Sequence, residues 1–460
     1  LLGRLSEQYE VQLIDPIHDY VVQELEKRSS QFVSKKHLSV FTVTFNVNAE
    51  QSADDISRLI YPEQGEDGNT TLYDVVMVGL EEVVELSPGK IMSIDPTIRL
   101  FWEQKIQAVL VAHGGQKYTL LRGEQLGGIL ALVFVRGSAE NSKYIKEIET
   151  ASKNTGLKGM AANKGGVAIS FSYSNHLRLC FVVSHLAAGF NNAEERHQDF
   201  KTIANGMQFS KSRGLRDFDV VFWMGDFNFR IDSSNEDVRS LIAHAKKHPD
   251  RKQQVINKLF ESDQLNRQMS SGETFPFFDE HEISFLPTYK FDKGTDVYDS
   301  SEKERVPAWT DRIVTFAKKR SILEQLSYNS VPELKFSDHR PVYAIFRLAV
   351  DIIDDETRSV IEKKLYESRK MKVRAASLIL SKDISGGYDD VLHYGLPAPS
   401  SKGKKWWLQP SGDDETSGNK DSEIKRCRIR FRRLDSGKYE LNPEMSYNPF
   451  VGTDSFVRKK

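Results

Sequence analysis

The stretch Val220–Asn228 reads VVFWMGDFN and decides the fold. A short run of Val, Phe, Trp and Met that breaks off at Gly-Asp predicts a buried strand with polar side chains at its end. Other apolar runs end in the same way, and they are FTVTFNVN at Phe41–Asn48, VMVGLEE at Val76–Glu82, FVVSHLAAG at Phe181–Gly189, VPAWTDRI at Val306–Ile313 and FSDHRPV at Phe336–Val342. We therefore expect one cleft at the ends of sheet strands.

Helical and extended patterns alternate along the chain. Amphipathic spacing predicts helices over Asp15–Gln31, Thr97–His113 and Ala193–Lys211, with further helical segments in Ser234–Gln268. Strand patterns lie between them, at His37–Val47, Tyr73–Leu80, Tyr118–Arg122, Gly128–Arg136, Gly165–Tyr173, Leu177–Ser184, Asp219–Met224, Trp309–Phe316 and Pro341–Val350. Short strands interleaved with helices, many of them in hairpins, predict a mixed-sheet α/β sandwich.

The composition indicates one large folded region with additions at both ends. The chain has 460 residues, of which 39% are hydrophobic, and this is enough for one large domain. We expect a helical lead-in over 1–36, a globular domain over 37–350, and a partly disordered extension over 351–460 that is basic and rich in Pro, Gly and Ser. Because the sequence begins with Leu1 rather than Met, we expect a fragment or a processed product.

Charge and cysteine content narrow the classes of partner and compartment. The formal net charge is −1, so bulk charge gives no support to nucleic-acid binding. Basic residues cluster at Lys402–Trp407 and Lys425–Arg433, which suits an anionic surface or, equally, a solvated edge strand. Part of the second cluster, with Tyr439–Leu441, predicts a small hairpin. Cys180 and Cys427 are too few for a disulfide framework and favour a reducing compartment, with Cys180 as a small core residue.

Carboxylates and carboxamides dominate the predicted strand ends. Their oxygen atoms suit a hard cation such as Mg²⁺, for which Glu82, Asn46 and, through water, Asp338 are candidates. Asp226 and Asn228 would point to the same side of an extended segment, where Asp226 could polarise a water that Asn228 holds. For each residue alone, a surface turn or a cap is the competing interpretation.

The imidazoles suit proton transfer and anion stabilisation. His339 follows Asp338 just before a strand, and Asp311 is expected to fix the tautomer of its ring. His185 ends another buried strand and would donate a hydrogen bond to a phosphate oxygen as negative charge grows. A lone histidine is more often structural, but all these residues are expected at strand ends of one domain. Together they predict a Mg²⁺-dependent phosphoester hydrolase.

The motifs also resemble those of a known family. The constellation is similar to that of the endonuclease/exonuclease/phosphatase superfamily with the DNase I-like fold. RVPAWTDR at Arg305–Arg312 and WMGDFNFR at Trp223–Arg230 resemble the two signatures of the inositol polyphosphate 5-phosphatases. Further segments follow in the family's order over residues 20–348, among them GMAANKGGVAI, SHLAAG, PTYKF and SDHRPV. The resemblance implies a four-layer α/β sandwich, with the catalytic domain at 37–350.

The resemblance implies roles for single residues. The positions that match catalytic residues are His185, Asp226, Asn228, Asp311 and His339. Those that match the metal region are Asn46, Glu82 and Asp338. Those that match phosphate-binding residues are Tyr289, Lys290, Lys303 and Arg305 for the 4-phosphate of the inositol ring, and Asn163 and Lys164 for the 1-phosphate side. One departure is Glu81, where the family commonly has Gln, and a carboxylate there would add negative charge near the site.

The implied function is hydrolysis of the 5-phosphate of phosphatidylinositol 4,5-bisphosphate with Mg²⁺. The 3,4,5-trisphosphate and soluble inositol polyphosphates are further candidate substrates. The trailing GLPAPSS and KWW are similar to synaptojanin-like enzymes, especially fungal ones, which implies a cytoplasmic monomer that acts peripherally at membranes in endocytosis. Asn448, Pro449 and Phe450 form an NPF motif, a ligand for EH domains of endocytic adaptors. The alternatives are a nuclease of the same fold and an inactive scaffold that acts through this motif.

Overall fold

The computed structural model describes residues 10–12, 16–63, 71–85, 96–114, 118–137, 144–156, 161–174, 176–383, 428–433 and 439–441. The chain divides into two compact units, Ser34–Ile352 and a second unit formed by Leu1–Val33 with Ile353–Lys460. The NPF motif at Asn448–Phe450 and the basic cluster at Lys402–Trp407 lie outside the described residues. The predictions that concern them therefore remain predictions.

The larger unit is built on two mixed β-sheets. The six-stranded sheet has the order β11-β12-β2-β3-β5-β4, and the five-stranded sheet has the order β10-β9-β8-β7-β6. The strands of the first sheet are β2 (Val33–Asn46), β3 (Val75–Glu81), β4 (Tyr118–Leu126), β5 (Ile129–Arg136), β11 (Leu323–Ser330) and β12 (Val342–Ile353). The strands of the second are β6 (Ile145–Thr155), β7 (Ala161–Tyr173), β8 (Leu177–His185), β9 (Val220–Asp226) and β10 (Asp311–Ala317). The pairs β2–β3 and β8–β9 are parallel.

Alternate residues of the central strands face different cores. In β3, Met77 packs between the two sheets, whereas Val76 and Val78 face the outer core of the six-stranded sheet. In β9, Phe222 faces the core between the sheets and Trp223 faces the outer core of the five-stranded sheet. A strand that is buried on both faces has no polar face, and this explains the continuous apolar runs of the sequence.

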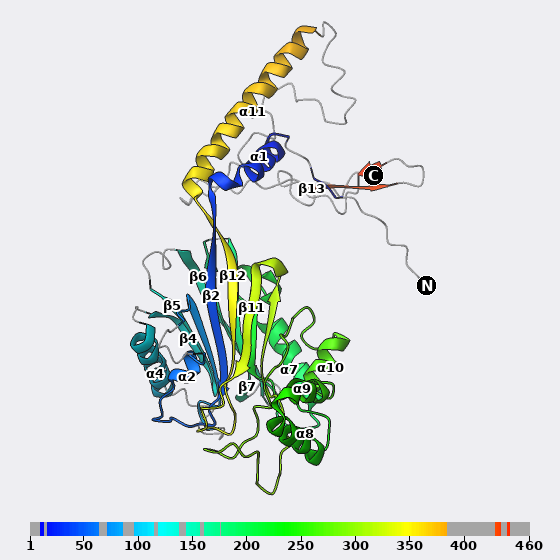
Figure 1. Ribbon diagram of the computed structural model, residues 1–460. Coiled ribbons are helices and arrows are strands. Elements are labelled where there is room, and N and C mark those ends of the chain that lie inside the picture. Colours follow the sequence, from blue (N-terminus) through cyan, green and yellow to red (C-terminus); the bar gives the residue numbers. More distant parts are fainter. Residues whose placement is uncertain are drawn as a thin grey trace. The chain divides into compact units, whose positions relative to one another are not determined.

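Helices cover the outer faces of the sheets (Figure 1). On the six-stranded side these are α2 (Ser57–Ile60) and α4 (Pro96–Gly114). On the other side are α7 (Ala193–Gly206) and α10 (Gln264–Ser271), whose buried apolar residues belong to the outer core of the five-stranded sheet. The buried apolar residues of α8 (Asn235–Lys247) and α9 (Lys252–Phe260) belong instead to the core that lies between the two sheets. Short 3₁₀ turns are η2 (Ser210–Ser212), η3 (Leu215–Asp217), η4 (Pro249–Arg251) and η5 (Arg320–Ile322). The order helix, sheet, sheet, helix confirms the predicted four-layer sandwich.

Most predicted elements of this unit are present, and the main differences concern the end of one helix and two strands. The helix predicted over Ala193–Lys211 ends at Gly206, because Met207 is already extended, with ψ of 112°. The strands β6 and β11 were not among the predicted strands. Cys180 is buried in the sheet, as predicted for a small core residue.

The second unit contains a helix pair and a small sheet. Helices α1 (Pro16–Lys27) and α11 (Asp355–Asp383), with η1 (Ser29–Gln31), enclose a cluster of Leu25, Phe32 and Leu365. The small sheet has the order β1-β13-β14, with bounds Glu10–Gln12, Arg428–Arg433 and Tyr439–Leu441. The predicted hairpin is confirmed. Because β13 lies between two other strands, the edge-strand interpretation of its basic run is wrong.

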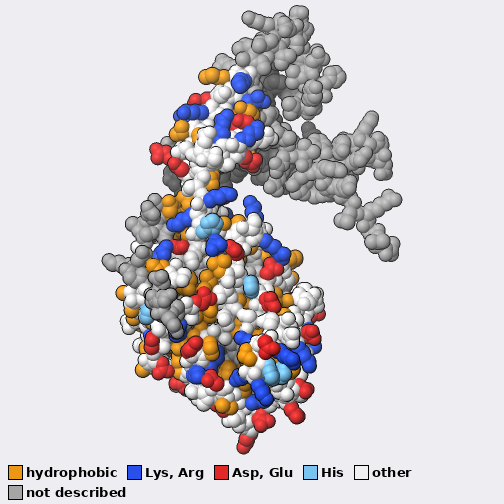
Figure 2. Space-filling view, in the orientation of Figure 1, with side chains coloured by type: hydrophobic (Ala, Val, Ile, Leu, Met, Phe, Trp, Pro, Cys, Tyr) orange, Lys and Arg blue, Asp and Glu red, His pale blue; other side chains and the backbone are white. Residues whose placement is uncertain are grey.

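The visible surface of the 34–352 unit carries both signs of charge. Figure 2 shows Lys and Arg side chains interspersed with Asp and Glu, in keeping with the formal net charge of −1. Among the residues that the structure describes, no helix is both long and apolar enough to cross a membrane.

A buried ion cluster joins the two sheets. Arg312 of β10 lies 3.0 Å from Asp263 and 2.5 Å from Glu280, and the side chains of Arg312 and Asp263 are 0% exposed. Glu280 also accepts a hydrogen bond of 2.8 Å from the hydroxyl of Tyr328, on β11 of the other sheet. Removing one partner of such a cluster leaves charge buried without compensation.

We therefore expect Arg312→Met to lower the free energy of unfolding by about 3–5 kcal/mol. Urea denaturation followed by circular dichroism measures this loss. The matched control is Arg320→Ala, because the Arg320 side chain is 82% exposed in its pair with Asp279, and an exposed pair contributes only about 0–1 kcal/mol. Equal effects of the two substitutions would show that the cluster is not a main contributor to stability.

Candidate active site

The ends of four strands bring together polar side chains that are far apart in the sequence. The parallel pair β2–β3 ends at Asn46 and Glu81, and the parallel pair β8–β9 ends at His185 and Asp226. Nδ2 of Asn46 donates a hydrogen bond of 3.1 Å to Oδ2 of Asp226, so the two ends meet. β10 begins at Asp311, directly opposite Asp226.

Gly225 allows β9 to approach β8 just before this meeting point. Its φ is 146°, and a Cβ at this position would lie 1.9 Å from the backbone oxygen of Ser184. Any larger residue would therefore collide with the neighbouring strand. The glycine of the Gly-Asp-Phe-Asn motif thus has a structural role that places Asp226 at the strand end.

Beyond Asp226 the chain turns instead of staying extended. The backbone N–H of Asn228 donates a 3.0 Å hydrogen bond to Oδ1 of Asp226, and Asn228 has φ of 58°. This is an Asx turn, so the expectation that both side chains point to one side of an extended segment is wrong. The Asn228 side chain donates to the carbonyl of Leu186 at 3.1 Å and accepts from Arg230 at 2.6 Å.

Asp226 is a buried carboxylate close to several basic side chains. Its Oδ2 lies 3.3 Å from Nε2 of His185. Burial acts to raise the pKa of Asp226, but His185, His339 and Lys164 outweigh burial and hold this pKa well below its usual value. Asp226 is therefore ionised at neutral pH. Because a carboxylate with a low pKa is a weak base, Asp226 is better suited to orienting a proton donor than to removing a proton.

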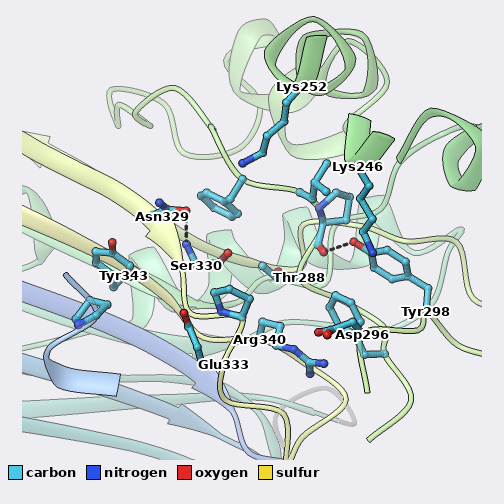
Figure 3. Close-up of a pocket in the computed structure, with 16 residues that line it drawn as sticks. Lys246, Lys252, Thr288, Asp296, Tyr298, Asn329, Ser330, Glu333, Arg340 and Tyr343 are labelled. Atoms are coloured by element: carbon cyan, nitrogen blue, oxygen red, sulfur yellow. Dashed lines mark hydrogen bonds between the residues drawn. The ribbon is translucent and has the colours of Figure 1, made fainter. Parts of the chain in front are cut away.

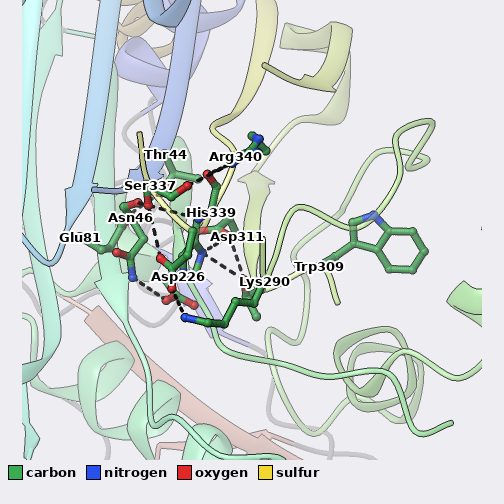
Figure 4. Close-up of polar contacts among 12 residues, drawn as sticks. Thr44, Asn46, Glu81, Asp226, Lys290, Trp309, Asp311, Ser337, His339 and Arg340 are labelled. Atoms are coloured by element: carbon green, nitrogen blue, oxygen red, sulfur yellow. Dashed lines mark hydrogen bonds and ion pairs between the residues drawn. The ribbon is translucent and has the colours of Figure 1, made fainter. Parts of the chain in front are cut away.

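His339 and Asp311 form a buried pair. Nδ1 of His339 lies 2.8 Å from Oδ2 of Asp311, and the hydroxyl of Thr310 donates to the same oxygen at 2.8 Å. Burial acts to lower the pKa of His339, but the Asp311 carboxylate outweighs burial and raises it to about 10. Burial holds the pKa of Asp311 above its usual value although His339 opposes this. At neutral pH we assign the pair as imidazolium and carboxylate, and Figure 4 shows it directed at Asp226.

Asp338 is held from two sides. Its Oδ1 accepts a 3.0 Å hydrogen bond from Nδ2 of Asn48, and its Oδ2 accepts one of 2.5 Å from Nζ of Lys290. Burial acts to raise the pKa of Asp338, but His339 and Lys290 outweigh burial and lower it. Lys290 thus already has an anionic partner inside the site, and a phosphate would have to share or replace that partner.

Tyr289 forms one wall of the site. Its ring centroid lies 4.5 Å from that of His339, and the guanidinium of Arg230 lies 4.6 Å from the Tyr289 ring. A tyrosine and two cationic side chains, those of Arg230 and Lys290, therefore lie together. Tyr289 and Lys290 are two of the residues that the family resemblance implies for binding the 4-phosphate.

Lys164 lies beside the histidine that ends β8. The predicted strand began only at Gly165, but the structure includes Lys164 in β7, where its Nζ contacts Nε2 of His185. Burial lowers the pKa of Lys164 to about 8, although Asp226 and Glu82 oppose this. Its neighbour Asn163 has a buried Oδ1 with no hydrogen-bond partner among the described residues.

Lys303 and Arg305 are not part of this network. Lys303 is exposed and Arg305 is half-buried. The backbone N–H of Arg305 donates to Asp299 at 2.9 Å. Neither side chain makes a hydrogen bond or an ion pair within the described part of the chain, so both remain candidates only by sequence.

Glu81 differs from its sequence-based interpretation. It is fully buried, and its Oε1 accepts a 2.9 Å hydrogen bond from the hydroxyl of Thr44. Burial raises the pKa of Glu81 well above its usual value, and the charges of Asp311 and Asp226 raise it further. These effects favour the uncharged carboxyl, contrary to the expectation of added negative charge, and an uncharged carboxyl resembles the Gln of the family pattern.

Two residues of the network were missed from sequence. Asn48 bridges toward Asp338, and Arg230 holds both Asn228 and Tyr289. Neither residue directly follows a buried strand, which was the pattern used to select candidates. The sequence could have indicated them only through their positions within the motifs FNVN and WMGDFNFR.

The donor set fits a hard divalent cation. The Glu82 side chain is 26% exposed and lies 3.8 Å from Nε2 of His185, and its carboxylate accepts no hydrogen bond from the residues that the structure describes. Oxygen donors with free lone pairs are what Mg²⁺ and Ca²⁺ require. Asp226, Asp311 and His339 also place polar atoms within 4.8 Å of one another, but the His339 imidazolium has no lone pair for a metal ion, so this set does not replace the predicted Asn46, Glu82 and Asp338.

A two-sheet sandwich with carboxylates, amides and imidazoles at its strand ends defines the endonuclease/exonuclease/phosphatase class. A family model described as endonuclease/exonuclease/phosphatase family 2 matches residues 43–345. The chain belongs to this family and, within it, to the synaptojanin-like inositol polyphosphate 5-phosphatases.

Three proteins illustrate the similarity. The chain is 42% identical over 470 residues to a phosphatidylinositol 4,5-bisphosphate 5-phosphatase of Saccharomyces cerevisiae, covering 96% of this chain and 46% of the relative. It is 40% identical over 469 residues to inositol-1,4,5-trisphosphate 5-phosphatase 1 of Schizosaccharomyces pombe, covering 98% and 40%. The third is the inositol polyphosphate 5-phosphatase domain of SPsynaptojanin, whose structure was solved with inositol (1,4)-bisphosphate and calcium ion. That domain is 42% identical in sequence and superimposes with a TM-score of 0.69. The match covers 79% of this chain and 100% of that domain. The chain thus spans less than half the length of these two full-length relatives.

Proposed function

We propose that the chain is a Mg²⁺-dependent phosphatase that removes the 5-phosphate of phosphatidylinositol 4,5-bisphosphate. The observation that carries this proposal is the position of ionised Asp226 between Asn46 and His185, opposite the His339–Asp311 pair. The names of the relatives support the choice of substrate class. The name of the second relative makes soluble inositol polyphosphates the next candidates to test, and the 3,4,5-trisphosphate, a candidate from the sequence, is tested with them.

In the proposed mechanism, the residues mainly position and stabilise charge. Asp226 orients a water whose oxygen forms the new bond to phosphorus as the bond from phosphorus to the inositol oxygen breaks, and the departing inositol oxygen takes up the proton that the water loses. A weakly basic carboxylate suffices, because the transition state of phosphoryl transfer is loose and needs little nucleophile activation. Asn228 fixes Asp226 through the Asx turn. His185 and the His339 imidazolium donate to the phosphate oxygens where negative charge is stabilised.

Glu82 and Asn46 would hold the Mg²⁺, which when bound supplies positive charge that polarises the 5-phosphate. Tyr289, Lys290 and Arg230 would receive the neighbouring 4-phosphate, with Arg305 and Lys303 at the rim. Asn163 would meet the 1-phosphate side together with Lys164.

Phosphate release from vesicles that contain phosphatidylinositol 4,5-bisphosphate and Mg²⁺ tests the proposal. We expect release from this lipid and none from phosphatidylinositol 4-phosphate. A panel with the 3,4,5-trisphosphate and inositol 1,4,5-trisphosphate ranks the other substrates. If no member of the panel releases phosphate, the proposal fails and the inactive scaffold is the remaining interpretation. Nicking of plasmid DNA in the presence of Mg²⁺ would favour the nuclease.

The same substrate class supports peripheral action at phosphoinositide membranes. We propose that the chain acts there as a monomer and without nucleic acid. The NPF motif at Asn448–Phe450 would recruit EH-domain adaptors of endocytosis. Binding of an isolated EH domain to the full chain, compared with the Phe450→Ala variant, measures this contact. Equal binding by both would remove the motif from the proposal.

Lys290→Ala should lower kcat/KM for phosphatidylinositol 4,5-bisphosphate by about 10–100-fold, the value of one charge-assisted hydrogen bond to phosphate. The loss should be much smaller for phosphatidylinositol 5-phosphate, which lacks the 4-phosphate. Lys293→Ala is the matched control, since Lys293 lies nearby in the chain and pairs with exposed Glu50. Equal losses on the two lipids would show that Lys290 acts through Asp338 instead of through the 4-phosphate.

A further inference from the structure

A cavity of about 670 Å³ lies behind the segment that carries Tyr289 and Lys290. Its walls come from α8, the first residue of α9, the 285–298 segment and the connection from β11 to β12. The cavity is lined by Thr288 and Arg340, the neighbours in sequence of Tyr289 and His339. It is therefore close to the candidate active site but separate from it.

One extended segment separates the cavity from the site. The backbone N–H of Arg340 donates to the carbonyl of Thr288 at 2.9 Å, and Tyr289 forms bridges with Ala308 and His339. Successive side chains of an extended segment point to opposite faces. Thr288 accordingly lines the cavity, whereas the ring of Tyr289 packs on His339.

The charged groups of the cavity favour an anion. Lys246, Lys252 and Arg340 line it, together with the carboxylates of Asp296 and Glu333. Asp296 is already paired with Lys335 at 2.6 Å, so its charge is compensated. Figure 3 shows Lys252 reaching from its helix into the cavity, and within the described chain it makes no hydrogen bond or ion pair.

Two buried donors of the cavity floor lack partners. The Thr288 side chain is 1% exposed and its hydroxyl has no hydrogen-bond partner among the described residues. Arg340 is 2% exposed, and its Nε also has none. Buried polar groups without partners are costly, and two such donors beside a cationic cavity point to an acceptor-rich ligand.

The remaining walls are aromatic. Phe285, Phe291, Tyr298 and Tyr343 line the cavity, and the rings of Phe291 and Tyr298 stack at a centroid distance of 4.4 Å. Lys246 lies 5.4 Å from the Tyr298 ring. Flat apolar walls with a few polar groups are typical of sites for small ring-bearing ligands.

We propose that this cavity binds a small organic phosphate, with a phosphate on Lys252 and Lys246 and a ring against the aromatic wall. Lysine is a suitable point charge for phosphate. The proposal does not depend on the hydrolytic activity, since none of these residues has a role in the proposed mechanism. The same chemistry is available as a free phosphate ester or as a lipid headgroup, and the experiment separates the two.

Pyridoxal 5′-phosphate is a direct probe, because it is a ring-bearing phosphate whose aldehyde condenses with a lysine amine, with loss of water, to an imine that borohydride reduces. Mass spectrometry then maps the labelled lysines of the full chain. We expect Lys252 or Lys246 to react about tenfold faster than exposed Lys258 and Lys247 on the same two helices, because bound phosphate raises the local concentration of aldehyde. Labelling at Lys164 reports on the active site separately.

Competition decides whether the labelling reflects a site. Inositol 1,4-bisphosphate or vesicles of phosphatidylinositol 4-phosphate should slow labelling in the cavity. The more effective of these competitors shows whether the cavity binds a free phosphate ester or a lipid headgroup. In the Lys252→Glu variant, the competitor should protect Lys246 from labelling about tenfold less well, the loss expected for one charge-assisted contact. The Lys258→Glu variant should show the same protection of Lys246 as the unmodified chain. Labelling of the cavity lysines at the rate of Lys258 and Lys247, or labelling that neither competitor slows, would overturn the proposal.

Discussion

Replacing Asp226 with alanine is expected to abolish measurable phosphate release while the fold is retained. The carboxylate orients the attacking water in the proposed mechanism and also holds Asn46 and His185 at 3.1 and 3.3 Å. Loss of a group that positions a reactant or preorganises charge lowers kcat by about 10²–10³-fold, and we expect at least the upper end because both partners lose their anchor. Phosphate release from phosphatidylinositol 4,5-bisphosphate vesicles measures the effect.

Two further variants separate charge from packing. Asp226→Asn keeps the shape of the side chain and the acceptor of the Asx turn, but it loses the negative charge, so we expect nearly the same loss of kcat as for alanine. Asp250→Ala is the control for a distant carboxylate, since the Asp250 side chain is 78% exposed. Circular dichroism should show the same secondary structure in all three proteins. An unchanged kcat in Asp226→Ala would remove this residue from the mechanism.

The sequence was informative wherever a strand is buried on both faces. Val76, Met77 and Val78 face alternate cores, so the whole run is apolar and its end is visible as the first polar residue. The same holds for the run that ends at Asp226. Because strand ends meet at one edge of the sandwich, most of the candidate site could be assembled from these endings alone.

Two of the four edge strands of the large sheets were not predicted. β6 and β11 each lie at one edge of their sheets, and each has mostly polar, partly exposed residues with a register shift. The strands at the opposite edges, β4 and β10, were predicted. Without a continuous apolar face, β6 and β11 have no strong strand pattern. Pairing with a neighbouring strand specifies them, and that is a property of the fold.

Features that depend on three-dimensional neighbours were also missed. The turn at Asn228 depends on the Asp226 carboxylate, and the position of Lys164 depends on the pairing of β7 with β8. The protonation of Glu81 depends on its burial beside two other carboxyl groups. Local sequence encodes none of these relations, which arise only once the strands have paired.

The second large effect is expected for the pair of His339 and Asp311. A pKa of His339 raised to about 10 means that the imidazolium is retained at neutral pH and lost only as the pH rises through that value. Asp311→Asn removes the charge that raises this pKa, so His339 should become neutral at a lower pH. NMR titration of the imidazole in both proteins measures the shift directly.

The kinetic consequence of Asp311→Asn should be large. If the imidazolium stabilises the transition state, kcat at pH 7.5 should fall by about 10⁴-fold, the loss seen when a histidine in a catalytic triad loses its orienting carboxylate. His339→Asn should lose a similar amount, and the double variant should lose little more, because the two residues act as a unit. The Asp311→Asn variant should regain part of its activity at lower pH, where His339 is again protonated. Losses that multiply in the double variant, or an imidazole whose titration does not move, would mean that Asp311 acts independently of His339.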